Sequence, residues 1–323
     1  MIHQEFLLHR HPANPLIKPA DFPGGGADGV RNCGQTMLGD ETILLVAVDH
    51  RSDGWKGRPG RTTHVARSKD GIHFTIEPEP FLISPTEEEE PFYSQFDQHP
   101  IDTRVTKIGD TYYICRPGGG WACKWGTTVL LGRTKDFRTH EYVGLIGLPE
   151  NRGASLFPEK INGRYARLDR PAQNKGAPNG NLWISYSPDL IHWGDFKPVL
   201  AAGYTTWAWH KIGPTPPIRT DKGWLEIIHG VTSSCAGARY LIGAILLDLD
   251  DPSRVIGKTR SYLLAPLALY EQTGRVPNVV FPCGAIANFA TDTLRMYYGA
   301  ADTSVCLATG SISEIVDACL KEL

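Results

Sequence analysis

The chain has 323 residues, of which 41% are hydrophobic and 21% are charged. This composition excludes an intrinsically disordered protein, because it can bury a large core. Its 33 lysines and arginines against 35 aspartates and glutamates leave a formal net charge of −2, so there is no broad positive field to hold nucleic acid or an anionic membrane. We expect neither as a partner, and a bound anion requires a local cluster of cations.

The N-terminal segment and the cysteines indicate the compartment. The first twenty residues contain an apolar run of only three residues, too short for a signal peptide or a spanning helix. The seven cysteines form no C-x-x-C pair and are odd in number, which argues against a disulfide framework or a structural zinc site. We therefore expect a cytoplasmic protein with buried free thiols.

Runs rich in β-branched and aromatic residues recur along the chain, separated by Gly, Pro, Asn and Asp, and predict β-strands. In chain order these runs are TILLVAV (42–48), DTYYICR (110–116), NLWISYS (181–187), WLEIIHGV (224–231) and LRMYYGA (294–300). The C-terminal segment instead predicts a helix with one apolar face, begun by a capping box of Ser311 and Glu314. That face contains Ile312, Ile315, Val316, Cys319 and Leu320.

A short pattern recurs three times between predicted strands, as ARSKDGIHF (66–74), GRTKDFRTH (132–140) and SYSPDLIHW (185–193). In each copy an Asp follows two residues after Ser or Thr, where its side chain can close a turn on its own backbone, which predicts a hairpin tip. Residues 246–255 and 306–315 are candidates for the same point of two further units. Five units predict an all-β fold, a single five-bladed β-propeller domain over residues 1–323 with a short C-terminal helix.

The densest polar stretch is DQHPIDTR (97–104), directly before a predicted strand. Loops that enter strands near a propeller axis are where binding groups collect. Asp102 is flanked by Ile101 and Thr103, so partial burial would raise its pKa and let it hold a proton for a leaving group. The alternative is a structural Asp that accepts backbone N–H bonds.

A basic cluster occupies residues 151–170 in a chain with no net positive charge. Arginine forks suit phosphate and carboxylate groups. Arg164 follows a turn-forming Asn-Gly and is expected to face solvent, whereas Arg170 ends a strand and can point at the axis. The cluster contains Arg152, Lys160, Arg164, Arg167 and Arg170. Further along, His229 follows an apolar run and is either a site residue or a satisfied core histidine.

Several segments of the chain resemble, in the same order, segments of the sequences of glycoside hydrolase family 130. This family contains the inverting β-mannoside phosphorylases and β-mannosidases. The segments include RVTKIGDTYYI, LFPEKINGRYARLDRP, SYSPDLIHWG, KIGPTPPI, GWLEIIHGV, LLDLDDPSRV, VPNVVFPCGA and YYGAADTSVCLATG. The resemblance is continuous from about residue 100 to 323 and looser from Asn14 through 66–74. It implies a five-bladed β-propeller, in agreement with the repeat.

The resemblance also implies roles for particular residues. Asp102 matches the single catalytic Asp of the family, a general acid thought to act through a hydroxyl of the bound mannose. The phosphate-binding positions match Arg152, Arg170, Lys211, His229 and Tyr240. The positions that grip the mannosyl unit match Asn32, Asp49, Arg104 and Asp302.

Two departures from the family pattern bear on the site. Ala47 stands where the family usually has an arginine in its first blade, and Arg51 or Arg61 are the candidates to replace it. The segment from Arg116 to Lys124 differs from the family. This segment contains Gly118 to Gly120 and Trp121, and Trp125 follows it. Either the segment lines the subsite for the acceptor sugar, or its tryptophans pack a hairpin against a neighbouring blade.

These observations lead to the hypothesis of an inverting phosphorylase. It would cleave a β-mannoside, of the manno-oligosaccharide or mannosyl-glucose type, with inorganic phosphate to give α-mannose 1-phosphate. No metal or organic cofactor is expected, and the linkage, the acceptor and any homo-oligomer stay open. The first alternative is a β-mannosidase on the same fold, and the second is a non-catalytic propeller that binds sugar through aromatics such as Trp121, Trp125, Trp207 and Trp209.

Overall fold

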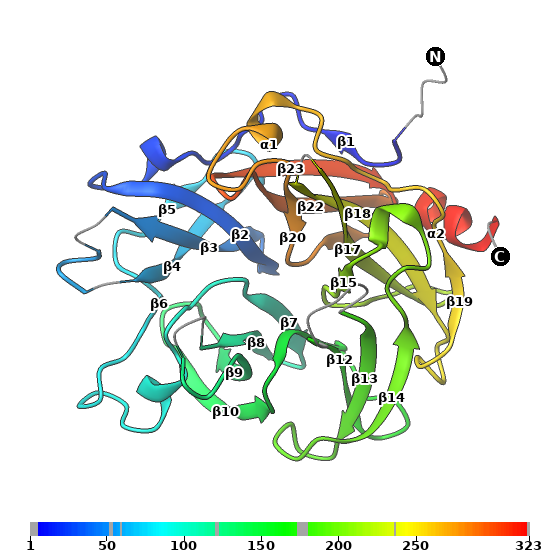
Figure 1. Cartoon of the computed structure of the whole chain (residues 1–323), viewed down its shortest axis with the longest axis horizontal. Coiled ribbons are helices and arrows are strands. Elements are labelled where there is room, and N and C mark those ends of the chain that lie inside the picture. Colours follow the sequence, from blue (N-terminus) through cyan, green and yellow to red (C-terminus); the bar gives the residue numbers. More distant parts are fainter. Residues whose placement is uncertain are drawn as a thin grey trace.

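Five antiparallel sheets surround one central axis in the computed structural model (Figure 1). The structure describes residues 6–51, 54–58, 60–119, 123–172, 180–235 and 237–321. The predicted all-β class, the five-bladed β-propeller and the short C-terminal helix are confirmed.

The first three blades follow one another along the chain. The first contains β2 (Ala27–Leu38), β3 (Glu41–His50), β4 (Arg61–Ser68), β5 (Thr75–Ile76) and β6 (Leu82–Ile83). The second contains β7 (Arg104–Ile108), β8 (Thr111–Gly118), β9 (Thr128–Thr134) and β10 (Glu141–Gly147). The third contains β11 (Asn151–Leu156), β12 (Tyr165–Pro171), β13 (Leu182–Ser187) and β14 (Gly194–Leu200).

The last two blades and the helices complete the chain. The fourth blade contains β15 (Lys211–Gly213), β16 (Ile218–Arg219), β17 (Trp224–Ser234), β18 (Gly237–Leu247) and β19 (Val255–Lys258). The fifth contains β20 (Val280–Pro282), β21 (Ile286–Asn288), β22 (Thr293–Ala300), β23 (Ser304–Ser311) and β1 (His9–Arg10). The helices are α1 (Leu269–Gln272), α2 (Ile312–Lys321) and 3-10 turns at Pro19–Asp21, Tyr93–Gln95 and Thr206–Ala208. The five predicted strands coincide with β3, β8, β13, β17 and β22.

The N-terminal strand closes the ring. β1 pairs with β23, so His9 lies opposite Thr309 and the two ends of the chain share the fifth blade. Arg10 stabilises the pairing of β1 with β23. Its Nε and Nη2 each donate a hydrogen bond of 2.8 Å to the buried carboxylate of Glu271 in α1. A bidentate pair of this kind fixes geometry as well as adding energy.

The repeated Asp pattern forms the turn between the third and fourth strands of each of the first three blades. At the first copy the amide groups of Ile72 and His73 donate to Asp70 Oδ1 at 2.8 Å, and Gly71 N donates to Ser68 Oγ at 2.9 Å. Asp136 and Asp189 make the same bonds, and residues 246–255 occupy the equivalent turn of the fourth blade. The hairpin interpretation is therefore confirmed.

Residues 306–315, the candidate for the same point in the fifth blade, lead into a helix instead of a strand. Because β1 already fills the outer place of the fifth blade, the chain after β23 is free to turn into α2. Ser311 Oγ accepts from Glu314 N at 3.1 Å, as in a capping box. The buried residues of α2 are Ile312, Ile315, Val316 and Cys319, which confirms the predicted apolar face.

The core consists of five hydrophobic clusters, each formed mainly by two neighbouring blades. In β3, Ile43 and Leu45 face the second blade, whereas Leu44 and Val46 face the fifth. Successive strand residues point to opposite faces, and both faces are buried between blades. This explains why the strands appear in the sequence as continuous apolar runs and not as alternating ones.

Trp207 belongs to this core. It is 4% exposed, and its Nε1 donates to Arg260 O at 2.8 Å. A side chain on Gly230 or Gly243 would overlap its ring. Trp125 and Trp209 are exposed, and Trp121 lies outside the described residues.

We expect Gly243→Ala to destabilise the protein, because its new methyl group would overlap the Trp207 ring. Overpacking of a core typically costs about 1–3 kcal/mol, which denaturant unfolding would measure. Gly194→Ala is the matched control, since no atom lies within 4 Å of a Cβ placed there. Equal stability of the two variants would contradict this account of the packing.

All seven cysteines are free, as predicted, and six are buried, whereas Cys235 is exposed. Cys235 lies between β17 and β18, at the end of a long hairpin. Among the described residues, no helix combines the length and the apolar character that a membrane span needs.

Candidate active site

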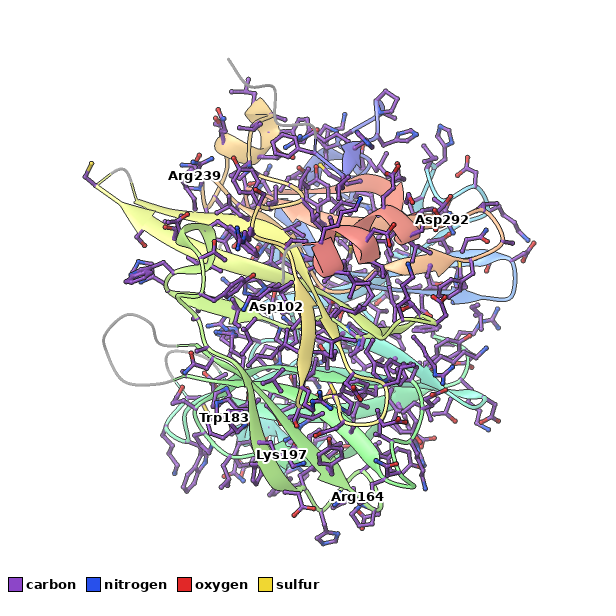
Figure 2. The ribbon with its side chains drawn as sticks, turned by 90° about the vertical axis from the view of Figure 1, so that its right-hand side faces the viewer. Asp102, Arg164, Trp183, Lys197, Arg239 and Asp292 are labelled. Atoms are coloured by element: carbon purple, nitrogen blue, oxygen red, sulfur yellow. The ribbon has the colours of Figure 1, made fainter. Side chains whose placement is uncertain are left out.

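A cavity of about 330 Å³ brings together side chains from all five blades. Blade 1 contributes through β2, and blade 2 through Asp102, two positions before β7. The later blades contribute through β11, β12, β15, β17, β18, β20 with the segment before it, and the turn after β22. The lining residues are Arg31, Asn32, Asp102, Arg152, Arg170, Lys211, His229, Tyr240, Val276, Val279, Phe281 and Asp302. Figure 2 shows Asp102 near the middle of the molecule, with Arg164 and Lys197 at its periphery.

The predicted site residues therefore converge, with two exceptions. Asp102, Arg152, Arg170, Lys211, His229, Tyr240, Asn32 and Asp302 line the cavity. Asp49 and Arg104 do not, although both were expected to grip the sugar. The roles of these residues stay predictions.

Asp102 is held in one orientation from two sides. Asn32 Nδ2 donates to Asp102 Oδ1 at 2.8 Å, and an Nη of Arg104 donates to the Asp102 main-chain oxygen at 2.7 Å. Its backbone has a φ of 52°, in the left-handed region that few residues other than glycine adopt. The carboxylate thus faces the cavity in a conformation that its neighbours impose.

The expectation of a raised pKa at Asp102 is wrong for the ligand-free site. Burial alone would raise the pKa of Asp102, but the positive charges of Arg152, Arg31 and Arg104 and the Asn32 hydrogen bond outweigh it. Its pKa is lowered overall, so the free protein holds Asp102 ionised. Local sequence could not show this, because two of the three arginines, Arg31 and Arg152, come from other blades.

Three cations without carboxylate partners line another part of the cavity. Among the described residues, Arg152, Arg170 and Lys211 form no ion pair, and Arg170 Nε has no hydrogen-bond partner. Burial, with Arg104 and Arg152 nearby, lowers the pKa of Arg170 to about 10. Uncompensated buried charge is costly, so this arrangement is suited to an anionic ligand. We call these three residues the cationic wall.

The rest of the basic cluster serves other purposes. Arg164 is exposed, as predicted, and pairs with Asp195. Arg167 is buried, and its Nε lies 2.8 Å from Asp169 Oδ1. Lys160 lies over the ring of Tyr165. The alternation of strand residues explains the split, because Arg167 and Arg170 are three apart in β12 and point to opposite faces.

Lys211 provides a prediction about pH. Burial, with Arg170 and Arg152 nearby, lowers its pKa to about 7, so it is protonated below that pH and neutral above it. Phosphate affinity should therefore fall as pH rises through about 7. In Lys211→Arg the guanidinium stays charged, so binding isotherms across pH should show only the titration of phosphate itself. The same pH dependence in both proteins would contradict the prediction.

His229 is not a satisfied core histidine. It is fully buried, yet neither ring nitrogen has a hydrogen-bond partner within the described chain. Burial, together with the charges of Arg170, Lys211 and Arg104, lowers its pKa well below the usual value, so the ring is neutral. Its ring centroid lies 4.6 Å from that of Phe281, beside the cationic wall. A neutral imidazole here can donate or accept one hydrogen bond to a ligand.

Asp49 and Arg104 lie behind the cavity and not on its surface. Arg31 Nε donates to Asp49 Oδ2 at 2.5 Å, and Arg61 binds the other oxygen. Each Asp49 oxygen therefore already accepts a hydrogen bond from an arginine. Arg104 donates through Nε to Pro214 O at 3.0 Å and through its Nη1 to Asp102. It is 2% exposed and positions Asp102.

Arg31 is the residue that the sequence analysis missed. It lies directly opposite Ala47 in the pairing of β2 with β3, and cross-strand partners have neighbouring side chains. The arginine absent at Ala47 is thus supplied from the adjacent strand. Of the two candidates named from the sequence, Arg61 contacts Asp49, whereas Arg51 is exposed and lies 3.5 Å from Asp28. A regular hairpin of residues 27–38 with 41–50 would have placed Arg31 opposite Val48, and the β-bulge between Arg31 and Gly34 moves it opposite Ala47.

The segment from Arg116 to Lys124 is described only in part, because residues 120–122 lie outside the described ranges. Arg116 is buried and forms an ion pair with Asp97, whose Oδ2 also accepts from the Tyr142 hydroxyl at 2.6 Å. This network ties the stretch that leads to Asp102 onto the second blade. Trp125 is not among the residues that line the cavity.

A larger hollow of about 680 Å³ lies beside β10 and β14. It is mostly apolar and contains exposed Leu148 and Phe196. Asn151 and Pro171 line it, whereas their neighbours Arg152 and Arg170 line the smaller cavity, since adjacent strand residues face opposite sides. The convergent charged groups make the smaller cavity the candidate active site.

Comparison with known proteins identifies the family. The family model for glycoside hydrolase family 130, described as beta-1,4-mannooligosaccharide phosphorylase, matches residues 46–321. The chain belongs to glycoside hydrolase family 130.

Characterised members of family 130 are similar over most of the chain. A beta-1,4-mannooligosaccharide phosphorylase of Ruminococcus albus is 37% identical over 314 residues, covering 96% of this chain and 90% of the relative. A beta-1,2-mannobiose phosphorylase of Listeria innocua is 43% identical over 253 residues, covering 78% of this chain and 67% of the relative. The solved structure of a beta-1,2-mannobiose phosphorylase from Listeria innocua with beta-1,2-mannobiose superposes with a TM-score of 0.83 at 33% identity, covering 98% and 99% of the two chains.

Proposed function

We propose that the protein is an inverting β-mannoside phosphorylase that uses inorganic phosphate to release α-mannose 1-phosphate. The observation that carries the proposal is a cavity in which one oriented carboxylate, Asp102, faces three cations that have no carboxylate partner among the described residues. The names of the family 130 relatives supply the substrate class, a β-mannoside. The linkages in those names differ, so the linkage is left to experiment.

The charge distribution favours phosphate over water as the nucleophile. An inverting hydrolase needs a second carboxylate to activate water. The other carboxylate of the cavity, Asp302, accepts a hydrogen bond from Arg31 at 3.1 Å. Phosphate arrives already anionic, so the cationic wall can bind and orient it without a base. This supports phosphorolysis over the β-mannosidase alternative.

Phosphate binding would also prepare Asp102 for its role as acid. The charge of Arg152 lowers the pKa of Asp102 in the free protein. A bound phosphate would offset that charge and raise the pKa of Asp102 toward the value that a proton donor needs. In the reaction, a phosphate oxygen bonds to the anomeric carbon as the glycosidic bond breaks. The proton of Asp102 passes to the leaving oxygen, in the family through a mannose hydroxyl.

The test is to incubate the protein with β-1,4-mannobiose, β-1,2-mannobiose and β-mannosyl-glucose, with and without phosphate. Phosphorus NMR should show α-mannose 1-phosphate only when phosphate is present, and the best substrate would identify the linkage. Release of free mannose at the same rate without phosphate would instead show a hydrolase. Binding without turnover of any substrate would show a sugar-binding protein.

A further inference from the structure

Arg31 stands between the cavity and two carboxylates. Its Nε donates to Asp49 Oδ2 at 2.5 Å, and its Nη1 donates to Asp302 Oδ2 at 3.1 Å. Its Nη2 lies 3.4 Å from Asp49 Oδ1. A guanidinium carries five N–H groups, and these bonds use three of them. One N–H on each Nη is therefore left, and the side chain lines the cavity.

The two parts of the cavity differ in charge. Arg152, Arg170 and Lys211 have no carboxylate partner among the described residues, so this wall attracts an anion. Arg31 pairs with both Asp49 and Asp302, and Arg61 also pairs with Asp49, so two arginines face two carboxylates. The Arg31 side has no excess positive charge for phosphate, but it offers donors and acceptors to neutral groups. The cationic wall is therefore suited to phosphate, and the part of the cavity around Arg31 and Asp302 is suited to sugar hydroxyl groups.

We propose that Arg31 and Asp302 together bind two neighbouring hydroxyl groups of the sugar that enters the cavity. The free N–H groups of Arg31 donate to one hydroxyl oxygen, and the Asp302 carboxylate accepts from the adjacent hydroxyl. Asp49 contributes indirectly, since it holds the guanidinium in place. The proposal rests on the proposed function, which supplies the sugar, and it assigns recognition of the mannosyl unit to a residue that the family pattern does not place there.

The experiment compares Arg31→Gln with Arg61→Gln in steady-state phosphorolysis. Arg61 contacts the same carboxylate but does not line the cavity, so it is the matched control. Loss of a hydrogen bond to a charged group corresponds to about 10- to 100-fold. We expect Arg31→Gln to lower kcat/KM for the mannoside by that factor and to change the phosphate KM less than about 3-fold. Arg61→Gln should change both values less than about 3-fold.

A second measurement uses the unaltered protein, which removes any dependence on the folding of a variant. In the synthetic direction, α-mannose 1-phosphates that each lack one ring hydroxyl replace the complete sugar phosphate. The wild type should lose activity with two analogues whose missing hydroxyls are neighbours. Arg31→Gln should be less sensitive than the wild type to one of these losses, because its partner is already absent.

The outcomes separate this inference from the proposed function. A wild type that is inactive with every mannoside would overturn both. An active wild type that accepts all deoxy analogues equally would overturn only the role of Arg31. So would an Arg31→Gln variant with an unchanged mannoside KM and only a shifted pH profile, since Arg31 would then act solely through the charge of Asp102. Equal losses in Arg31→Gln and Arg61→Gln would assign the effect to Asp49 and would likewise overturn it.

Discussion

Asp102→Asn should lower kcat for phosphorolysis by about 10²- to 10⁴-fold, the usual contribution of a general acid. The amide keeps the size of the carboxylate and can still accept the bond that Asn32 donates at 2.8 Å, so the fold should be retained. It cannot deliver a proton to the leaving group. Rates with a natural mannoside, together with circular dichroism and a melting curve, would measure both parts of the prediction.

The control for this variant is Asp110→Asn. Asp110 is exposed and pairs with Lys135 on the surface of the second blade, so its loss should leave kcat within about 2-fold of wild type, as for most surface substitutions. A substrate with an activated leaving group that needs no protonation should partly restore the rate of Asp102→Asn. Wild-type activity in a folded Asp102→Asn protein would remove this residue from the mechanism.

Arg152→Ala and Arg170→Ala should each raise the phosphate KM by about 10- to 100-fold, since a hydrogen bond to a charged group contributes about 1.5–3 kcal/mol. Both side chains line the cavity, and neither has a carboxylate partner among the described residues. Phosphate dependence of the initial rate and direct titration with inorganic phosphate would measure the change. The mannoside KM should change far less.

Arg164→Ala is the matched control, because this arginine belongs to the same basic stretch of sequence but pairs with Asp195 at the periphery (Figure 2). Its phosphate KM should equal that of the wild type. If all three variants bound phosphate equally well, the cationic wall would not be the phosphate site. If all three lost affinity equally, long-range charge and not direct contact would explain the binding.

The local pattern of the sequence was sufficient to predict most of the fold. Each Ser/Thr-x-Asp pattern closes its turn through bonds to residues two or three positions away, so nothing distant is needed to form it. The same holds for the apolar face of α2. Closure by β1 was not predicted, because a two-residue strand has no periodicity and its partner Thr309 lies 300 residues later.

The site was predictable in part. The resemblance to the family identified eight side chains that line the cavity. It also assigned Asp49 and Arg104 to the mannosyl unit, although neither side chain lines the cavity. Whether a charged residue faces a ligand or a partner depends on which groups surround it in space. Asp49 is covered by Arg31 and Arg61, and strand pairing decides which arginine reaches it.

The sequence by itself determined the main strands, the Asp turns and the C-terminal helix, because these follow from periodicity and short-range hydrogen bonding. The residues that converge on the axis were assigned through the resemblance to family 130. Only the tertiary structure decided the charge state of the site. Asn32 and Asp102 are 70 positions apart yet share a hydrogen bond, and the arginines that lower the pKa of Asp102 come from the first and third blades as well as its own. Electrostatic energy depends on distance and burial in space, which separation along the chain does not specify.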